Sequence, residues 1–134
     1  MSVVSLSLPY PCSVNSYWLT SGKRRYISKR GMAFKAAAAE ACNGLTGFGS
    51  DPVEVSIVLY PRDKRLLDID NICKCILDSL QGYLYEDDQQ VWKLTVERAE
   101  KIKGGGCDVT VKEYRKHDPT ISKHVAALIE DLTK

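Results

Sequence analysis

The sequence predicts an α+β fold, a single mixed β-sheet with helices packed on it, in the order β-α-β-α-β-β-α. Residues 3–8 and 53–60 alternate apolar and polar side chains, which is the period of a half-buried strand. Residues 68–80 carry apolar side chains at helical spacing on one face. A chain of 134 residues fits one domain, which we assign to residues 1–134, with 115–134 as a C-terminal helical extension.

The first half of the chain is predicted to contain two strands and one helix. The strand over residues 3–8 ends at Pro9, and a loop follows through Gly22. Ser28 is a suitable N-cap for a helix that continues to about Cys42. The strand over residues 53–60 ends at Pro61, because proline cannot donate a hydrogen bond to a strand ladder.

The second half is predicted to contain two strands between two helices. The helix from about residue 68 to residue 80 ends before Gly82, which suits the C′ position of a helix. Strands are expected over residues 91–96 and 107–111, and the glycines at 104–106 predict a hairpin turn between them. A last helix is expected over about residues 120–132, after Pro119.

Cysteine usage and hydropathy point to a cytoplasmic protein. The five cysteines are an odd number without zinc-site spacing, so we expect reduced thiols. No apolar run approaches the roughly 20 residues of a membrane span, so no membrane partner is expected. The first residues lack the basic region of a signal peptide, which favours the cytoplasm.

Positive charge is concentrated in two clusters. The first 39 residues contain six Lys or Arg residues and no Asp or Glu, although the whole chain sums to only +2. Either cluster could be an ordinary solvated surface, but such clusters also suit a polyanion, whose released counterions drive binding. The candidate DNA-binding residues are Lys23, Arg24, Arg25, Lys29, Arg30, Arg62, Lys64 and Arg65.

Acidic residues gather around the predicted helix at 68–80. Asp68 and Asp70 stand at its start, Lys74 lies one turn further on, and Asp87 and Asp88 follow it. Carboxylates repel each other, so a fold that gathers them needs a compensating charge, usually a hard divalent cation. Two simpler interpretations remain open. The first two acids could be helix caps, and Asp70 with Lys74 could be a surface ion pair.

Two other acidic motifs fit the spacing poorly. An EF-hand loop beginning at Asp68 needs Gly at its sixth position and Glu at its twelfth, but Cys73 and Ser79 stand there. A phosphotransferase D-x-D motif follows an apolar strand directly, whereas the basic residues 62–65 intervene here. Both functions are therefore disfavoured.

A magnesium-dependent nuclease fits the spacing better. Asp68, Asp70 and an acid of the 87–88 pair could share one or two hard cations. Lys74 could then stabilise the charge that develops on a phosphate, and Asn71 could orient a water or a carboxylate.

These residues resemble a known family. The strongest match is Asp68-x-Asp70-Asn71-x-x-Lys74, then Asp78-x-Leu80 and Asp87-Asp88-x-Gln90-Val91, which resembles the pattern of the RusA family of Holliday-junction resolvases. The segment Leu8-Pro9-Tyr10-Pro11-Cys12-Ser13-Val14-Asn15 resembles the family's L-P-x-P-P-S-x-N start. The resemblance covers roughly residues 6–114. Cys12 replaces a proline, and Leu66 and Leu67 stand where some members carry arginine.

The resemblance implies a homodimeric endonuclease that nicks two strands of a four-way DNA junction. It implies Mg²⁺ as cofactor, with Mn²⁺ able to substitute. By motif position, Asp68, Asp70 and Asp88 would be metal-binding and catalytic, and Lys74 would assist catalysis. Asp87 and Asn71 would support them. The protein would be cytoplasmic and associated with the nucleoid when bound to branched DNA.

Two alternative functions remain open at this point. One is a non-catalytic protein that binds branched DNA, and the other is a metal nuclease that acts on flaps or single strands. The role of the aromatic residues near the first basic cluster is also open. Tyr17, Trp18 or Tyr26 could stack on an unpaired base at the crossover, although aromatic residues near a strand end more often pack in the core.

Overall fold

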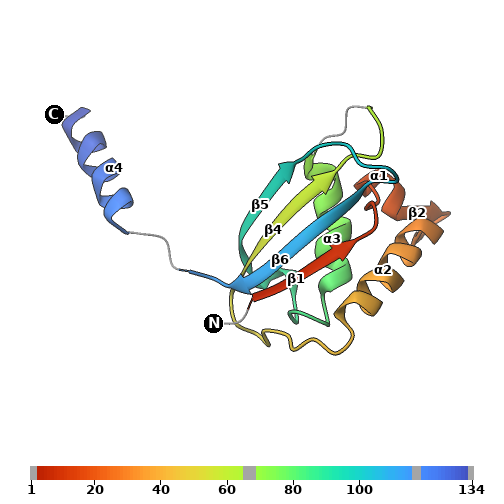
Figure 1. The fold of residues 1–134 in the computed structure, drawn as a ribbon. Coiled ribbons are helices and arrows are strands. Elements are labelled where there is room, and N and C mark those ends of the chain that lie inside the picture. Colours follow the sequence, from red (N-terminus) through yellow and green to blue (C-terminus); the bar gives the residue numbers. More distant parts are fainter. Residues whose placement is uncertain (1–2, 65–68, 116–118, 133–134) are drawn as a thin grey trace.

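A computed structural model describes residues 3–64, 69–115 and 119–132 of the chain. Its central feature is a four-stranded sheet in the order β1-β6-β4-β5 (Figure 1). The strands are β1 (Val3–Leu8), β4 (Val53–Tyr60), β5 (Val91–Arg98) and β6 (Gly106–Glu113). β6 is antiparallel to β1 and β4, whereas β5 is parallel to β4, so the predicted mixed sheet is confirmed.

Two helices pack together beside the sheet, α2 (Lys29–Cys42) and α3 (Cys73–Leu80). A turn of 3-10 helix, η1 (Ile69–Ile72), leads into α3, so the predicted helix at 68–80 is divided. Ser28 caps α2 as predicted, because its Oγ accepts a hydrogen bond from the Gly31 N–H at 3.1 Å. Gly82 follows α3 with φ +89°, the left-handed conformation expected of a C′ glycine.

The core lies between one face of the sheet and the helices. Ile57 and Leu59 of β4 are at most 1% exposed, and Ile72, Ile76 and Leu80 are fully buried. This arrangement follows from the two sequence periods, since alternate strand residues and helical i, i+4 residues each form one apolar face.

The opposite face of the sheet is polar. There, Asp108 of β6 accepts hydrogen bonds from the Ser7 hydroxyl at 2.8 Å and from the Tyr60 hydroxyl at 3.0 Å. The helices therefore cover the apolar face, and the polar face is left to solvent.

The predicted loop through Gly22 is wrong, because this segment is folded. It contains a short helix, α1 (Val14–Tyr17), and a two-stranded hairpin formed by β2 (Trp18–Ser21) and β3 (Arg24–Ile27). The hairpin turns at Gly22, whose φ is +62°. Its base is held by the Ser28 N–H, which donates to the Tyr17 carbonyl at 2.9 Å. Each strand has only four residues, and the apolar ones stand in adjacent pairs rather than at alternate positions, so the segment lacks the alternation that marks a strand in a sequence.

The predicted hairpin between β5 and β6 is also wrong. β4 lies between these strands, and the connection crosses the end of β4. Ala99 N–H donates to the Leu59 carbonyl at 2.8 Å, and Ile102 N–H donates to the Pro61 carbonyl at 3.0 Å. The glycine turn is real, since Gly104 and Gly105 have φ of +80° and +69°. A turn signal is local, however, and it cannot show which strands pair.

The C-terminal helix α4 (Pro119–Leu132) lies apart from the sheet in Figure 1. Val125, Leu128, Ile129 and Leu132 are each about half or more exposed on it. No helix within the described ranges has the length and apolar character needed to cross a bilayer. All five cysteines are free thiols, as expected from their number.

Glu54 is a buried carboxylate on β4 that binds the backbone just after the end of β6. Its side chain is 7% exposed, and its Oε1 accepts a hydrogen bond from the Arg115 N–H at 2.8 Å. Its Oε2 lies 3.6 Å from the Lys112 ammonium on the facing position of β6. The Arg115 hydrogen bond, together with the nearby lysines, lowers the pKa of Glu54 despite its burial.

We expect Glu54→Gln to reduce the free energy of unfolding at pH 7 by about 1 kcal/mol, the difference between a charged and a neutral hydrogen bond. Because the folded-state pKa is lowered, this contribution is present above the ordinary carboxyl pKa of about 4.3 and is lost as the pH falls through the folded-state value. Denaturant unfolding between pH 7 and pH 3 measures the difference. The exposed control Glu40→Gln should change little, and a Glu54→Gln deficit that persists at low pH would contradict the assignment.

Candidate active site

Lys74 of α3 makes the central contact among the predicted site residues. Its Nζ lies 2.9 Å from Asp78 Oδ1, one helical turn further on, and 3.2 Å from Asp88 Oδ2. Asp88 begins the 3-10 turn η2 (Asp88–Gln90), which leads directly into β5. The contact therefore places Asp88, from the acidic pair at 87–88, against α3, the helix that follows the acidic residues at 68 and 70.

The Lys74 ammonium is held as a cation between two carboxylates. The Lys74 side chain is 49% exposed, whereas Asp88 is 30% exposed and Asp78 only 17%. The hydrogen bond to Asp78 raises the pKa of Lys74 most, the bond to Asp88 adds to it, and partial burial opposes both. The group remains protonated at neutral pH, so it can donate to a third anion, such as a phosphate, without first taking up a proton.

Asp70 lies one helical turn before Lys74, in the first turn of η1, and is exposed. The N-cap position of α3 is Ile72, which provides no capping side chain, so Asp70 does not cap α3. Asn71 is half-buried in η1. Asp68 lies outside the described residues, and among those described no three acidic, His or Cys side chains form a cluster suited to a metal ion. The predicted metal set, which includes Asp68, therefore stays a prediction.

The adjacent acids Asp87 and Asp88 face different partners. Asp87 Oδ1 accepts a hydrogen bond from the Gln89 N–H at 2.9 Å, so Asp87 caps the η2 turn. Asp88 instead faces Lys74. The structure thus gives Asp87 a local structural role and leaves Asp88 as the acid of this pair that faces the site.

Gln90 anchors this turn to a distant loop. Its Oε1 accepts hydrogen bonds from the N–H groups of Glu86 and Asp87, at 2.7 and 2.9 Å. Its Nε2 donates to the carbonyls of Gly49 and Asp51, at 2.8 and 2.9 Å. The capping box that Gln90 forms with Asp87 is a local signal in the sequence. The bonds of its Nε2 gave no such signal, because Gly49 and Asp51 lie about 40 residues away in the sequence. The i,i+4 spacing of Lys74 and Asp78, by contrast, was a visible signal for their ion pair.

The three candidate stacking residues have different environments. Tyr17 is fully buried, and burial, followed by the charge of Asp78, raises its pKa to about 12. Trp18 is partly buried, packs edge-to-face on Tyr17 at 5.3 Å and carries the Arg25 guanidinium 4.4 Å from its ring centre. Tyr26 is 40% exposed. Of these three, all within the described residues, Tyr26 is the most exposed.

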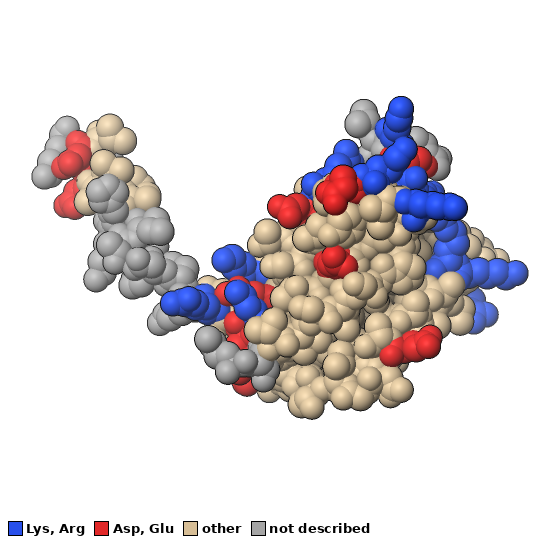
Figure 2. All heavy atoms as spheres, in the orientation of Figure 1, with Lys and Arg blue, Asp and Glu red and all other residues tan. Residues whose placement is uncertain are grey.

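Basic residues surround the end of the molecule that carries α1. Figure 2 shows Lys and Arg gathered there and down the side formed by the hairpin. Because α1 contacts both α3 and η1, the hairpin grows from a helix packed against the candidate site. Arg62 lies over the Tyr10 ring at 4.8 Å, and Arg65 lies outside the described residues. The other predicted DNA-binding residues are exposed: Lys23, Arg24, Arg25, Lys29, Arg30 and Lys64.

Comparison with known proteins adds to this geometry. The family described as Endodeoxyribonuclease RusA matches residues 9–112. A crossover junction endodeoxyribonuclease of Enterobacteria phage HK97 is 32% identical over 116 residues, covering 84% of this chain and 97% of the phage protein. Proteins with that description from Escherichia coli strain K12 and Enterobacteria phage 82 are each 31% identical over the same shares. The matched family region contains every predicted site residue and ends before α4.

We expect Gln90→Glu to lower the free energy of unfolding by about 1–3 kcal/mol, because the amide donors are lost and a carboxylate is placed against two carbonyl oxygens. Gln89→Glu is the matched control, since it adds the same charge at an exposed neighbour whose backbone N–H, not its side chain, bonds Asp87. Thermal and denaturant unfolding of the two variants give the comparison. Equal losses in both would show that added charge, rather than the Gln90 anchor, is responsible.

Proposed function

Because the chain belongs to the RusA family of endodeoxyribonucleases, we propose that it resolves four-way DNA junctions by hydrolysing one phosphodiester in each of two strands. The observation that best supports this function is the contact of Lys74 with Asp88 at 3.2 Å. It holds Asp88, from the second acidic segment, against the helix that begins directly after Asp70, and basic residues are exposed on the neighbouring hairpin. The descriptions of the relatives as crossover junction endodeoxyribonucleases favour a four-way junction as substrate.

We propose Mg²⁺ as the cofactor, with Mn²⁺ as a substitute, held by Asp68, Asp70 and Asp88. Carboxylate oxygens are the ligands that a hard cation prefers, and of the donors that the structure describes, Asp70 is exposed and Asp88 is 30% exposed, so both are open to a cation. When bound, such a cation supplies an acidified water and neutralises charge on the phosphate.

The protein's own residues would position the substrate and balance its charge. Lys74 donates to a non-bridging phosphate oxygen where negative charge increases during hydrolysis. Asp78, the less exposed of its two partners, keeps the ammonium anchored while Asp88 is engaged elsewhere. Gln90 and Asp87 hold the η2 turn, so Asp88 stays in place. Asn71 orients a water or a carboxylate.

Binding of DNA would rest on the exposed lysines and arginines of the hairpin and of the segment after β4. Phosphate contacts of this kind set position and register and read the shape of the junction rather than its base sequence. Two symmetric cuts require two active sites, which a homodimer with two-fold symmetry provides.

A cleavage assay with labelled four-way junction, flap and linear duplex, in Mg²⁺ or in EDTA, tests this function. We expect paired nicks in the junction with Mg²⁺ and none in EDTA. Asp70→Asn should abolish cutting and leave junction binding near normal, because removing a carboxylate eases its repulsion of DNA. Asp131→Asn on α4 is the matched control and should cut normally. Normal cutting by Asp70→Asn, or faster cutting of flaps than of junctions, would refute the proposal.

Lys74→Ala should lower single-turnover cleavage by about 100-fold or more at saturating protein and Mg²⁺, because a charge-stabilising donor is lost. Its junction affinity, measured by gel shift in EDTA, should change much less. Lys29→Ala, which removes an exposed positive charge on α2, should show the reverse pattern. Equal losses of cleavage and affinity in Lys74→Ala would mean that Lys74 only anchors a phosphate.

A further inference from the structure

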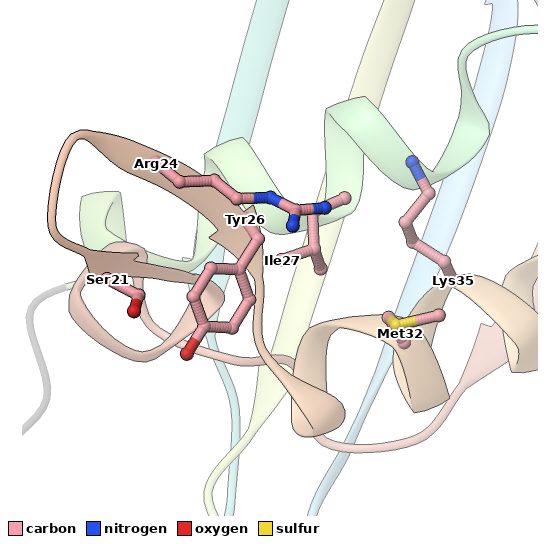
Figure 3. Close-up of a pocket in the computed structure, with 6 residues that line it drawn as sticks. All are labelled: Ser21, Arg24, Tyr26, Ile27, Met32 and Lys35. Carbon is pink, nitrogen blue, oxygen red and sulfur yellow. The ribbon is translucent and has the colours of Figure 1, made fainter.

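A groove lies between the β2–β3 hairpin and the start of α2, apart from the proposed active-site residues. We call it the hairpin groove. Its cavity of about 640 Å³ is lined by Ser21, Arg24, Tyr26, Ile27, Met32 and Lys35 (Figure 3). A neighbouring cavity of about 690 Å³ shares Tyr26, Ile27 and Met32 with it, so the groove continues on both sides of these residues. Each volume falls within the range of ligand-binding pockets.

The walls of the hairpin groove are held by close packing. A Cβ atom on Gly31 of α2 would lie 2.7 Å from Ile27 Cγ2 and 2.9 Å from Tyr17 Cδ1, so the hairpin approaches the helix as closely as glycine permits. The Ser28 hydroxyl donates to the Ser16 carbonyl, and the Ser28 N–H donates to the Tyr17 carbonyl. The groove is therefore built into the fold and does not depend on a ligand to form.

Exposed apolar side chains form the surface of the groove. Tyr26 is 40% exposed and Met32 is 62% exposed. Leu19, which lines the neighbouring cavity, is 42% exposed. Such a cluster on a protein surface indicates a site that a partner covers.

The charged residues that line the groove are all basic. Arg24 and Lys35 line the first cavity, and Lys29 and Arg30 line the second. Figure 3 shows the Arg24 guanidinium extending from the hairpin toward α2, with the Tyr26 ring beside it. Residues 1–39 contain no Asp or Glu, so the hairpin and the start of α2 carry no acidic residue of their own. This combination of positive charge and apolar surface suits an anion that also has an apolar component.

We propose that the hairpin groove binds an unpaired strand of the DNA substrate, with one base against Tyr26 and Met32 and its flanking phosphates on Arg24 and Lys35. This inference rests on the proposed function, because that function is the reason to expect DNA at this surface. A paired duplex would present its phosphates to the rim and leave the apolar floor uncovered, whereas an unpaired strand offers both bases and phosphates. The bases of a four-way junction are paired, so the proposal requires that a base pair opens at the crossover when the protein binds, at the cost of unstacking and unpairing those bases. Helix α1 packs against α3 and η1, which places the hairpin that follows it beside the candidate active site.

Binding of a fluorescent single-stranded oligonucleotide to the full chain in EDTA tests this inference. Tyr26→Leu keeps the apolar surface but removes the ring, and it should weaken single-strand binding about 5- to 150-fold, the range measured for base–aromatic stacking. Tyr26→Phe keeps the ring and should bind like the wild type. Tyr83→Leu removes a tyrosine that is 49% exposed outside the groove and is the matched control. Affinity for linear duplex should change less than twofold in all three variants.

A base analogue reports directly on stacking. The fluorescence of 2-aminopurine in the oligonucleotide should be quenched by the wild type and by Tyr26→Phe, and much less by Tyr26→Leu. Arg24→Gln and Lys35→Gln should each lower the slope of log affinity against log salt by about 0.7, the value for one phosphate of a single strand.

Three results would overturn the inference. Unchanged single-strand binding by Tyr26→Leu would show that the ring does not stack. Equal losses for single strand and duplex would make the groove a phosphate anchor. If Tyr26→Leu changes the molar mass measured by analytical ultracentrifugation but not the DNA affinity, a second copy of the chain fills the groove. Junction cutting in Mg²⁺ is measured separately, so single-strand binding without cutting contradicts only the proposed function, and cutting without single-strand binding contradicts only this inference.

Discussion

The ammonium of Lys74 between Asp78 and Asp88 is the interaction on which the candidate site depends. Carboxylates from separate segments repel each other, and a shared cation allows them to lie within a few ångströms. The helix that carries Lys74 is held by its opposite face, where Ile76 and Leu80 are fully buried. The turn that carries Asp88 is held by Gln90, which bonds the loop before β4. Packing and hydrogen bonds therefore hold α3 and the η2 turn in place, and the charge of Lys74 offsets the repulsion between their carboxylates.

The polar residues of the family motif have distinct physical roles. Asp88 faces Lys74, Asp87 caps its own turn, Asp78 anchors the lysine, and Asp70 lies exposed one turn before it. A motif that appears in the sequence as a group of acids is therefore made of ligand candidates, a cap and a counter-ion. Asp87 and Asp78 are poorer candidates for metal ligands, because Asp87 already bonds the Gln89 N–H and Asp78 already pairs with Lys74.

The molecule also separates its charges in space. The basic hairpin packs against α1, and α1 contacts η1 and α3. A polyanion can be held by the basic surface while its backbone reaches the acidic site, where the protein by itself would repel it. The apolar hairpin groove lies within the basic surface and adds a means of holding bases as well as phosphates. Helix α4 lies beyond the region shared with the relatives, and its exposed apolar residues have no assigned role.

The sequence by itself determined the elements whose signals are local. Alternation predicted β1 and β4, and the Ser28 cap and Gly82 predicted helix ends. The motif spacing predicted Asp70, Lys74 and Asp88 as site residues, and the structure shows the contact between the last two. Tertiary structure decided everything that depends on distant partners. In the folded protein β4 lies between β5 and β6, where the glycines had predicted a hairpin. The segment predicted as a basic loop forms β2 and β3. The neighbours Asp87 and Asp88 have different partners, the Gln89 N–H and Lys74. The physical reason is that propensity, capping and turns act over a few residues, whereas strand pairing, the Gln90 bonds and the exposure of Tyr26 depend on segments that meet only when the chain folds.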